Sequence, residues 1–420
     1  MKFEIGYGRE SLSFNLDSHN LAGELTPKKF DVSLTEKQEI EQALAGPVDS
    51  DKLSEIVSPG EEVVIITSDI TRPLPSYKIL PTVLRELDRG GVKDEDIQIV
   101  FATGIHRGHS QNEQQELVGK NIYERVECID KDEDGCVNIG ETEAGTPVDI
   151  FEPVVRADRV ICLGNVEYHY FAGYSGGAKA VMPGVSTADA IENNHSMMVS
   201  EKSASGRMED NPVREDIEEI KDFLHIDFIV NVVLDEEKRI VKAAAGDPVN
   251  AHRVCCDYLD RHYRIKISDP ADTVVVSPGG HPKDLNLYQA QKALDNASRA
   301  VKEGGTIILA ASCSEGLGEE TFANWMEESD SPEEIIEKIQ QDFQLGGHKA
   351  AAIAMVLERC EVILVSDMGD DYTESIFFTA AESISEALEM AYKKAEAEES
   401  EVLIMPSGGS TLPVIDGEED

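Results

Sequence analysis

The sequence predicts an α/β fold built from two domains with mixed, largely parallel sheets. Short apolar runs of strand length alternate with amphipathic stretches of helical length along most of the chain. The chain has 420 residues, more than one hydrophobic core usually organises, so two domains are expected. Glycine-containing loops follow several of the apolar runs, at the position where open α/β sheets bind their ligands.

In the first part of the chain, runs rich in valine and isoleucine predict strands, and amphipathic stretches after them predict helices. The strands are expected at residues 62–67, 98–102, 159–163, 228–234 and 240–245. The helices are expected at residues 76–90, 111–119, 187–198, 212–224 and 248–261. Polar residues 235–238 separate two strands and predict a hairpin turn, which places an antiparallel pair beside the sheet.

A break in the alternation falls near residues 265–270, and a new strand, glycine turn and helix begin after it. Further strands are expected at residues 273–276, 306–310, 362–366 and 402–405, and further helices at 286–300, 331–345, 348–360 and 383–396. We therefore expect an N-terminal α/β domain over residues 1–268 and a C-terminal α/β domain over 269–400. The tail, residues 401–420, is a candidate for a return to the first domain.

Acidic residues outnumber basic residues by 82 to 38, which gives a formal net charge of −44. A surface of this sign repels phosphate backbones and anionic lipids, so neither nucleic acid nor a membrane is expected as a partner. The seven cysteines show no CxxC or zinc-ribbon spacing, which favours reduced thiols. The N-terminus has no apolar signal core, and no run approaches the ~18 apolar residues of a membrane span. These features predict a cytoplasmic protein.

The segment from His169 to His195 carries the strongest chemical signal, because it places two histidines and Lys179 around a Tyr-Ser-Gly-Gly turn. Lys179 can supply a positive charge or, when desolvated, a nucleophilic amine. The alternative is a plain turn between a strand and a helix, since such turns are common in α/β proteins and most bind nothing. The coincidence of catalytic residue types with glycines favours a cofactor pocket.

The turn itself has the composition of an anion site. Ser175 and the backbone amides of Gly176 and Gly177 can cradle an anion, as nests and helix N-termini do. It is not a Walker A loop, because Ala178 stands between the second glycine and the lysine.

Two further loops follow predicted strands. In the first, Arg72 suits a carboxylate or phosphate, whereas Asp69 and Thr71, on either side of Ile70, equally fit a role as caps of the next helix. The second holds His106 and a further histidine three residues on, His109, and suits proton transfer near neutral pH. Either histidine fits that role, and both fit an ordinary surface position.

A third loop, near residue 280, leads into a helix that carries Tyr288, Gln289 and Lys292 within one helical turn of each other. These side chains fit either a ligand-binding face or the exposed face of an amphipathic helix. No serine-histidine-aspartate arrangement with a nucleophile elbow is recognisable. No second soft ligand accompanies His195, so a metal bound there needs donors from another source.

The chain resembles the nickel-dependent lactate racemases and the related 2-hydroxyacid racemases and epimerases. The resemblance covers nearly the whole chain and rests on DITRP (69–73), TGIHR (103–107), HYFAGYSGGAKAVMPG (169–184), NNH (193–195) and GGHPKDLNLYQAQKAL (279–294). It implies two α/β domains with the active site in the cleft between them. It also implies a small-molecule 2-hydroxyacid substrate, racemised by reversible hydride transfer to a nickel pincer nucleotide.

This resemblance also implies roles for the residues named above. The cofactor, a pyridinium-3-thioamide-5-thiocarboxylic acid mononucleotide with nickel, would be tethered covalently to Lys179, and host cofactor-biosynthesis proteins would be partners. His195 would ligate the nickel, and His106 and His169 would be the acid/base pair. The remaining contacts would come from Asp69, Ile70, Thr71, Arg72, Ser175, Gly176 and Gly177 to the cofactor, and from Arg72, Tyr288, Gln289 and Lys292 to the substrate.

Two other hypotheses belong to different classes. A nucleotide-dependent phosphotransferase or hydrolase would use the glycine-rich loop and Lys179 with magnesium and ATP, but the Walker pattern is absent. A non-catalytic binding protein would keep the pocket without its chemistry. The intact set of His106, His169, Lys179 and His195 argues against that hypothesis.

Overall fold

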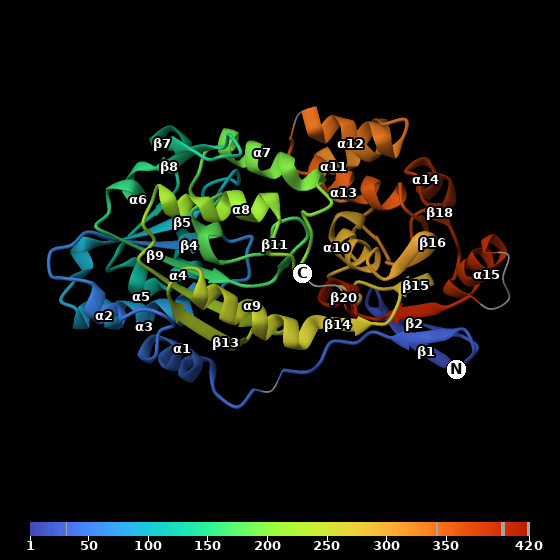
Figure 1. The fold of residues 1–420 in the computed structure, drawn as a ribbon, viewed down its shortest axis with the longest axis horizontal. Coiled ribbons are helices and arrows are strands. Elements are labelled where there is room, and N and C mark those ends of the chain that lie inside the picture. The colour runs from blue at the N-terminus through green and yellow to red at the C-terminus, as the bar shows by residue number, and fades with distance from the viewer. Residues whose placement is uncertain (31, 342, 396–399, 418–420) are drawn as a thin grey trace. The chain divides into compact units, whose positions relative to one another are not determined.

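The computed structural model describes residues 1–30, 32–341, 343–395 and 400–417, and the chain divides into two compact units (Figure 1). One unit is Phe30–Arg261. The other joins Met1–Lys29 to His262–Asp420. The predicted α/β fold with largely parallel sheets is confirmed, and each unit is built around one six-stranded sheet.

The sheet of unit Phe30–Arg261 has the strand order β13-β12-β9-β4-β5-β6. Its strands are parallel except β13, which pairs with β12 as the predicted antiparallel hairpin. From β4 the chain first builds β5 and β6 on one side and later β9 on the other, so a topological switch point lies beside β4. The sheet strands are β4 (Val63–Ser68), β5 (Ile97–Ala102), β6 (Glu127–Asp130), β9 (Arg159–Asn165), β12 (Phe228–Leu234) and β13 (Ile240–Gly246).

Helices cover both faces of this sheet (Figure 1). On one face, apolar residues of α1 and α3 pack with Ile65 of β4 and Ile99 of β5 in one buried cluster. Helices α7 and α8 lie on the opposite side (Figure 1). The helices are α1 (Glu36–Ala45), α2 (Leu53–Ile56), α3 (Ser76–Arg89), α4 (Gln111–Val118), α5 (Lys120–Tyr123), α6 (Glu152–Arg156), α7 (Ala188–Ser196), α8 (Pro212–Glu219) and α9 (Asn250–Tyr263). Two small hairpins add β7 (Cys136–Glu141), β8 (Pro147–Phe151), β10 (Tyr168–His169) and β11 (Gly173–Tyr174).

The sheet of the other unit has the order β18-β17-β16-β15-β19-β3 and is parallel throughout. Its edge strand β3 comes from the N-terminal segment, and Figure 1 shows β1 and β2, in blue, beside the C-terminal strands. Ile5 and Phe14 of that hairpin are buried in one cluster with Val275, Ile308 and Ile404. The strands are β1 (Lys2–Tyr7), β2 (Glu10–Asn15), β3 (Leu21–Glu24), β14 (Arg264–Ile267), β15 (Ala271–Val276), β16 (Val301–Ala310), β17 (Glu361–Val365), β18 (Thr379–Ala380), β19 (Val402–Met405) and β20 (Leu412–Ile415).

The helices of this second unit are α10 (Leu287–Ala297), α11 (Glu320–Glu328), α12 (Pro332–Gln341), α13 (Gly347–Leu357), α14 (Asp370–Ser375) and α15 (Ile384–Lys394). The predicted helices 331–345 and 383–396 correspond to α12 and α15, and their residues 342 and 396 lie outside the described part of the chain.

The division of the chain differs from the predicted boundaries. Residues 1–29 belong to the unit of the C-terminal segment, not to a domain spanning 1–268. The tail expected to return to the first domain instead stays with the C-terminal segment: β19 pairs with β15, and β20 pairs with β14. The reason is hydrogen bonding, because β15 and β14 each offer a parallel edge to the tail. Residues 418–420 of that tail lie outside the described part.

All seven cysteines are unpaired thiols, as predicted. Within the described residues, no helix has both the length and the apolar character that crossing a bilayer requires.

Candidate active site

Three neighbouring strands bring the predicted residues together. The order β9-β4-β5 places the carboxyl ends of these parallel strands side by side. The loop with Asp69 and Arg72 follows β4, His106 follows β5 shortly after Ala102, and His169 follows β9. The switch point is where an open α/β sheet forms its ligand site, so the loops meet there.

Three side chains of the central segment lie around one buried ring, that of Phe171. The ring centroids of His169 and His195 lie 4.5 and 4.8 Å from that of Phe171, and both rings meet it edge-on. The Nζ atom of Lys179, on the short turn Gly177–Ala180, lies 6.0 Å from the same centroid. Phe171 is only 2% exposed, so the ring is a fixed centre around which these three side chains are arranged.

The surroundings of Lys179 and His169 disfavour the charged form of both side chains. Burial lowers the pKa of Lys179 well below its ordinary value, and the charges of Arg72 and Arg214 lower it further. Burial likewise lowers the pKa of His169, with Lys179, His195 and the same two arginines adding to the effect. A neutral amine is a nucleophile, and its contact with Phe171 is then packing rather than a cation–π pair.

The proton position on His169 follows from its backbone contact. Its Nδ1 accepts a hydrogen bond from the amide of Ala172 at 3.3 Å. In the neutral ring the proton is therefore on Nε2.

Asp69 orients His106. Its Oδ2 lies 2.5 Å from Nδ1 of His106, and its Oδ1 accepts from the hydroxyl of Thr71 at 2.8 Å. Burial acts to raise the pKa of Asp69, but the hydrogen bonds from His106 and Thr71, with the charges of His106 and Arg72, outweigh it and leave the pKa below its usual value. The alternative role as helix caps is wrong, because Pro75 is the cap residue of α3 and no side chain caps it.

His109 has a structural role, which favours His106 as the candidate for proton transfer. Its side chain is 1% exposed, against 28% for His106. Its Nδ1 lies 2.6 Å from Oδ1 of Asp130, and its Nε2 accepts from the amide of Ile70 at 3.0 Å. Both nitrogens are thus engaged, and His109 holds the Asp69–Arg72 loop in place.

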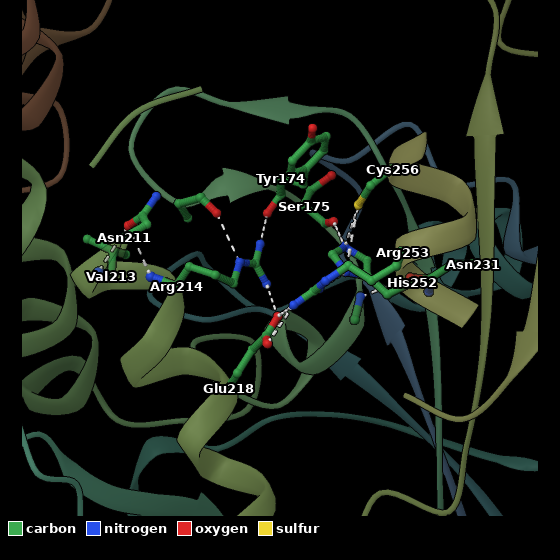
Figure 2. Close-up of polar contacts among 12 residues, drawn as sticks. Tyr174, Ser175, Asn211, Val213, Arg214, Glu218, Asn231, His252, Arg253 and Cys256 are labelled. Atoms are coloured by element: carbon green, nitrogen blue, oxygen red, sulfur yellow. Dashed lines mark hydrogen bonds and ion pairs between the residues drawn. The ribbon is translucent and has the colours of Figure 1, made fainter. Parts of the chain in front are cut away.

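A buried arginine supports the turn that leads to Lys179 (Figure 2). Arg214 of α8 is 1% exposed, and its Nε donates to the carbonyl of Ala172 at 3.0 Å. Its Nη2 donates to the carbonyl of Tyr174. Glu218, one turn along the helix, lies 3.7 Å from its Nη1 and is itself bound by Arg253.

Two more side chains support the same turn from β12 and α9 (Figure 2). Nε2 of His252 donates to the carbonyl of Ser175 at 2.8 Å, and its Nδ1 accepts from Arg253 at 2.8 Å. Burial, with the charges of Arg214 and Arg253, lowers the pKa of His252 well below its ordinary value. The amide oxygen of Asn231 accepts from the backbone amide of Gly177 at 2.9 Å.

Contacts within the protein already use several groups of the anion cradle predicted at Ser175–Gly177. The amide of Gly177 is used by Asn231, and the amide of Ser175 donates to the carbonyl of Glu167 at 2.9 Å. The hydroxyl of Ser175 donates to the carbonyl of Asn165 at 2.8 Å and accepts from the amide of Glu167. These groups therefore build the turn, and a phosphate would have to displace existing bonds to reach them.

The space around Gly173 shows how tightly the turn is packed. Its φ is +74°, and a Cβ atom there would lie 2.1 Å from the carbonyl oxygen of Arg207. Gly145 has a φ of +85° with nothing within 4 Å, so it is a matched control for backbone strain alone. We expect Gly145→Ala to lower the free energy of unfolding by about 1–2 kcal/mol. Gly173→Ala should cost about 1–3 kcal/mol more, because the backbone must move. Urea denaturation of both variants measures the difference, and equal losses would contradict the packing.

The predicted substrate residues Tyr288, Gln289 and Lys292 lie on α10 of the other unit. Lys349 of α13 fixes the first of them: its Nζ donates to the carbonyl of Tyr288 at 2.8 Å and lies 4.0 Å from its ring centroid. Sequence reasoning missed Lys349, as it missed Phe171, Arg214 and His252.

No group of three or more histidine, cysteine, aspartate or glutamate side chains within the described residues is placed to hold a metal. A metal on His195 would therefore need donors from another source.

Comparison with known proteins decides the family. A model of the lactate racemase N-terminal domain matches residues 7–206, and one of the C-terminal domain matches residues 267–413. A lactate racemase from Thermoanaerobacterium thermosaccharolyticum is 33% identical, with 97% of this chain and 98% of that protein covered. The chain belongs to the lactate racemase family.

Further relatives agree with this membership of the lactate racemase family. A lactate racemase from Lactiplantibacillus plantarum is 34% identical, with 96% of this chain and 98% of that protein covered. The structure of the Thermoanaerobacterium lactate racemase apoprotein has a TM-score of 0.89 at 31% identity, covering 99% of this chain and all of that one. A Thermotoga maritima protein with a TM-score of 0.65 and 20% identity, covering 92% of this chain and 100% of that one, shares the fold. The resemblance seen in the sequence is confirmed, and the lactate racemase family member is an isomerase of the racemase type.

Proposed function

We propose that this lactate racemase family member interconverts the enantiomers of a 2-hydroxyacid, lactate or a close relative, with a nickel pincer nucleotide attached to Lys179. The observation that carries the proposal is the buried amine of Lys179, arranged with His169 and His195 around the ring of Phe171 and with its pKa lowered by burial. A lysine forms a covalent bond to a cofactor through its unprotonated amine. The names of both curated relatives support lactate as the first substrate to test.

Lys179 and His195 fit this cofactor, whereas the turn at Ser175 and Gly177 would have to give up existing bonds to hold its phosphate. Lys179 supplies the attachment point, and His195 supplies one imidazole ligand while the described residues offer no competing metal cluster. When bound, the cofactor would supply a reversible hydride acceptor next to these residues. The host proteins that make the cofactor are then required partners.

The protein's own side chains handle the hydroxyl proton and the carboxylate. His169 can take the proton of the substrate hydroxyl at Nε2 once its ring proton moves to Nδ1, which gives up the bond from the Ala172 amide. Asp69 stabilises the imidazolium that forms when His106 takes the proton. The guanidinium of Arg72 suits the substrate carboxylate. Tyr288, Gln289 and Lys292 stay predicted substrate contacts, on the resemblance to the family alone.

The alternative, a phosphotransferase or hydrolase, is not favoured. Such an enzyme needs a charged lysine against phosphate oxygens, but the pKa of Lys179 is lowered well below its ordinary value, first by burial. The amides of Ser175 and Gly177 are also used within the protein.

Native protein should carry nickel and an added mass on Lys179, and it should convert one enantiomer of lactate into a racemic mixture. Intact mass, metal analysis and a chiral assay measure these three properties. Protein that instead turned over ATP with magnesium, and held no nickel, would overturn the proposal.

His106→Gln and His169→Gln should each lower the racemisation rate by about 10²–10⁴-fold, as expected when a general acid or base is removed. Nickel content and the Lys179 adduct should be retained, since neither histidine holds the cofactor in the proposal. His225→Gln is the matched control, because the side chain of His225 is 84% exposed. Unchanged rates in either test variant would remove that histidine from the acid/base pair.

A further inference from the structure

We infer that the buried amide of Asn194, aligned by the carboxylate of Asp216, sets the tautomer of His195 so that its Nε2 keeps a lone pair for a metal. Asn194 and Asp216 are then positioning residues that act through His195. The inference rests on the proposed nickel site. It gives a role to the buried hydrogen-bond network around Asp216, which takes no part in the proposed reaction.

The orientation of the Asn194 amide is decided by its surroundings. Asn194, in α7, is fully buried, and its Nδ2 donates to Oδ2 of Asp216 at 2.7 Å and to the carbonyl of Val213 at 3.1 Å. A reversed amide would point its oxygen at a carboxylate and a carbonyl, which are both acceptors. The amide oxygen of Asn194 must therefore face the other way, toward His195.

The tautomer of His195 follows from this orientation. Nδ1 of His195 lies 2.9 Å from Oδ1 of Asn194. An amide oxygen only accepts hydrogen bonds, so Nδ1 carries the ring proton and donates it. The lone pair of the neutral imidazole is then on Nε2. Histidines that ligate metals usually donate their other ring proton in this way.

Asp216 is itself held by donors alone. Its Oδ1 accepts from the hydroxyl of Thr142 at 2.5 Å, and its Oδ2 accepts from the hydroxyl of Thr146 at 2.9 Å. The Thr142 hydroxyl in turn accepts from the amide of Thr146 at 3.1 Å. Asp216, Thr142 and Thr146 are all buried, so the carboxylate cannot rotate toward water. The tight turn between β7 and β8 therefore fixes Asp216, which fixes Asn194.

Helix α8 is the common support of two site residues. Its Arg214 holds the turn that leads to Lys179, and its Asp216 aligns the amide beside His195. The proposed anchor and the proposed ligand are thus positioned from one rigid element, as a site needs if it is to be formed before the cofactor arrives.

The test is the position of the ring proton in apoprotein labelled with ¹⁵N-histidine. Long-range ¹H–¹⁵N correlation spectra distinguish the two tautomers, and His195→Gln identifies the signal. We expect the proton on Nδ1 in the wild-type protein and a shift toward Nε2 in Asn194→Ala. Asn193→Ala, at an exposed neighbour, should leave the signal unchanged. A wild-type proton on Nε2, or an unchanged tautomer in Asn194→Ala, would overturn the inference. The wild-type spectrum decides even if the variant does not fold.

A second measurement uses the loaded protein. Nickel transfer to a chelator should be about 10–100-fold more favourable in Asn194→Ala than in wild type or Asn193→Ala, as is typical when the partner of a ligating histidine is removed. The Lys179 adduct should be unchanged. If native wild-type protein contains no nickel, the proposed function is wrong, but the measured tautomer of His195 still stands. Equal nickel retention in all three proteins would overturn the role of Asn194.

Discussion

Lys179→Ala is expected to carry no covalent cofactor and to racemise lactate no faster than protein that was never loaded. Burial, with the charges of Arg72 and Arg214 nearby, lowers the pKa of Lys179 well below its ordinary value, which favours the nucleophilic, unprotonated amine. No other side chain of the cluster around Phe171 has an amine to replace it. Intact mass of the purified protein and a chiral assay measure both effects.

Two control variants separate loss of the covalent attachment at Lys179 from loss of its positive charge and from a general loss of folded protein. Lys179→Arg keeps a basic side chain of similar length but lacks the amine, so it should also remain without the adduct. Lys120→Ala removes an exposed lysine of the same unit and should keep both adduct and activity. Full activity in Lys179→Ala would remove the attachment point and the central argument of the proposed function.

Arg214→Met should lower the free energy of unfolding and loosen the turn that carries Lys179. Methionine fills much of the same volume but removes the guanidinium donor from the carbonyls of Ala172 and Tyr174, of which Ala172 still accepts from the amide of Tyr174. A buried carbonyl left unpaired costs about 1–3 kcal/mol, and only Tyr174 loses its donor here, so a loss of about 1–3 kcal/mol is expected. Glu218 adds little to this loss, because it stays bound to Arg253. Urea denaturation of the apoprotein measures the change.

The matched control is Arg89→Met, because Arg89 is 62% exposed and bonds only to Glu86 within its own helix. Its effect should stay within about 0.5 kcal/mol. Losing the charge of Arg214 should also let the pKa values of Lys179 and His169 rise toward their ordinary values. A stability equal to that of wild type would mean that the turn does not depend on Arg214.

The central strands of both sheets were predictable because they are buried on both faces and therefore read as continuous apolar runs. Val63–Ser68 and Val402–Met405 are of this kind. The edge strand Leu21–Glu24 alternates between partly buried and exposed residues, and its partner lies at the other end of the chain. A local pattern holds no information on such a partner, so the place of the first 29 residues could not be predicted.

The candidate site was predictable where a residue's own chemistry marks it, as for Lys179 and the histidines. Residues that only position another residue cannot be identified from their own residue type or spacing. Arg214 and Asp216 lie in the sequence PVREDIEE, which reads as an exposed, charged helix, and their burial follows only from the packing of α8. The caps expected from Asp69 and Thr71 failed because a carboxylate next to a histidine has a stronger partner than a helix end.

Because β3 pairs with β19, a strand near the start of the chain must wait for a partner that is synthesised near its end. During translation, strand Leu21–Glu24 leaves the ribosome early, but its partner Val402–Met405 is made roughly 380 residues later. At about 5–20 residues per second this interval is roughly 20–75 s, during which β3 has an unpaired edge. Residues 30–261 are synthesised without interruption in that interval, so we expect them to fold first. The nascent N-terminal hairpin is then the segment on which a chaperone would act.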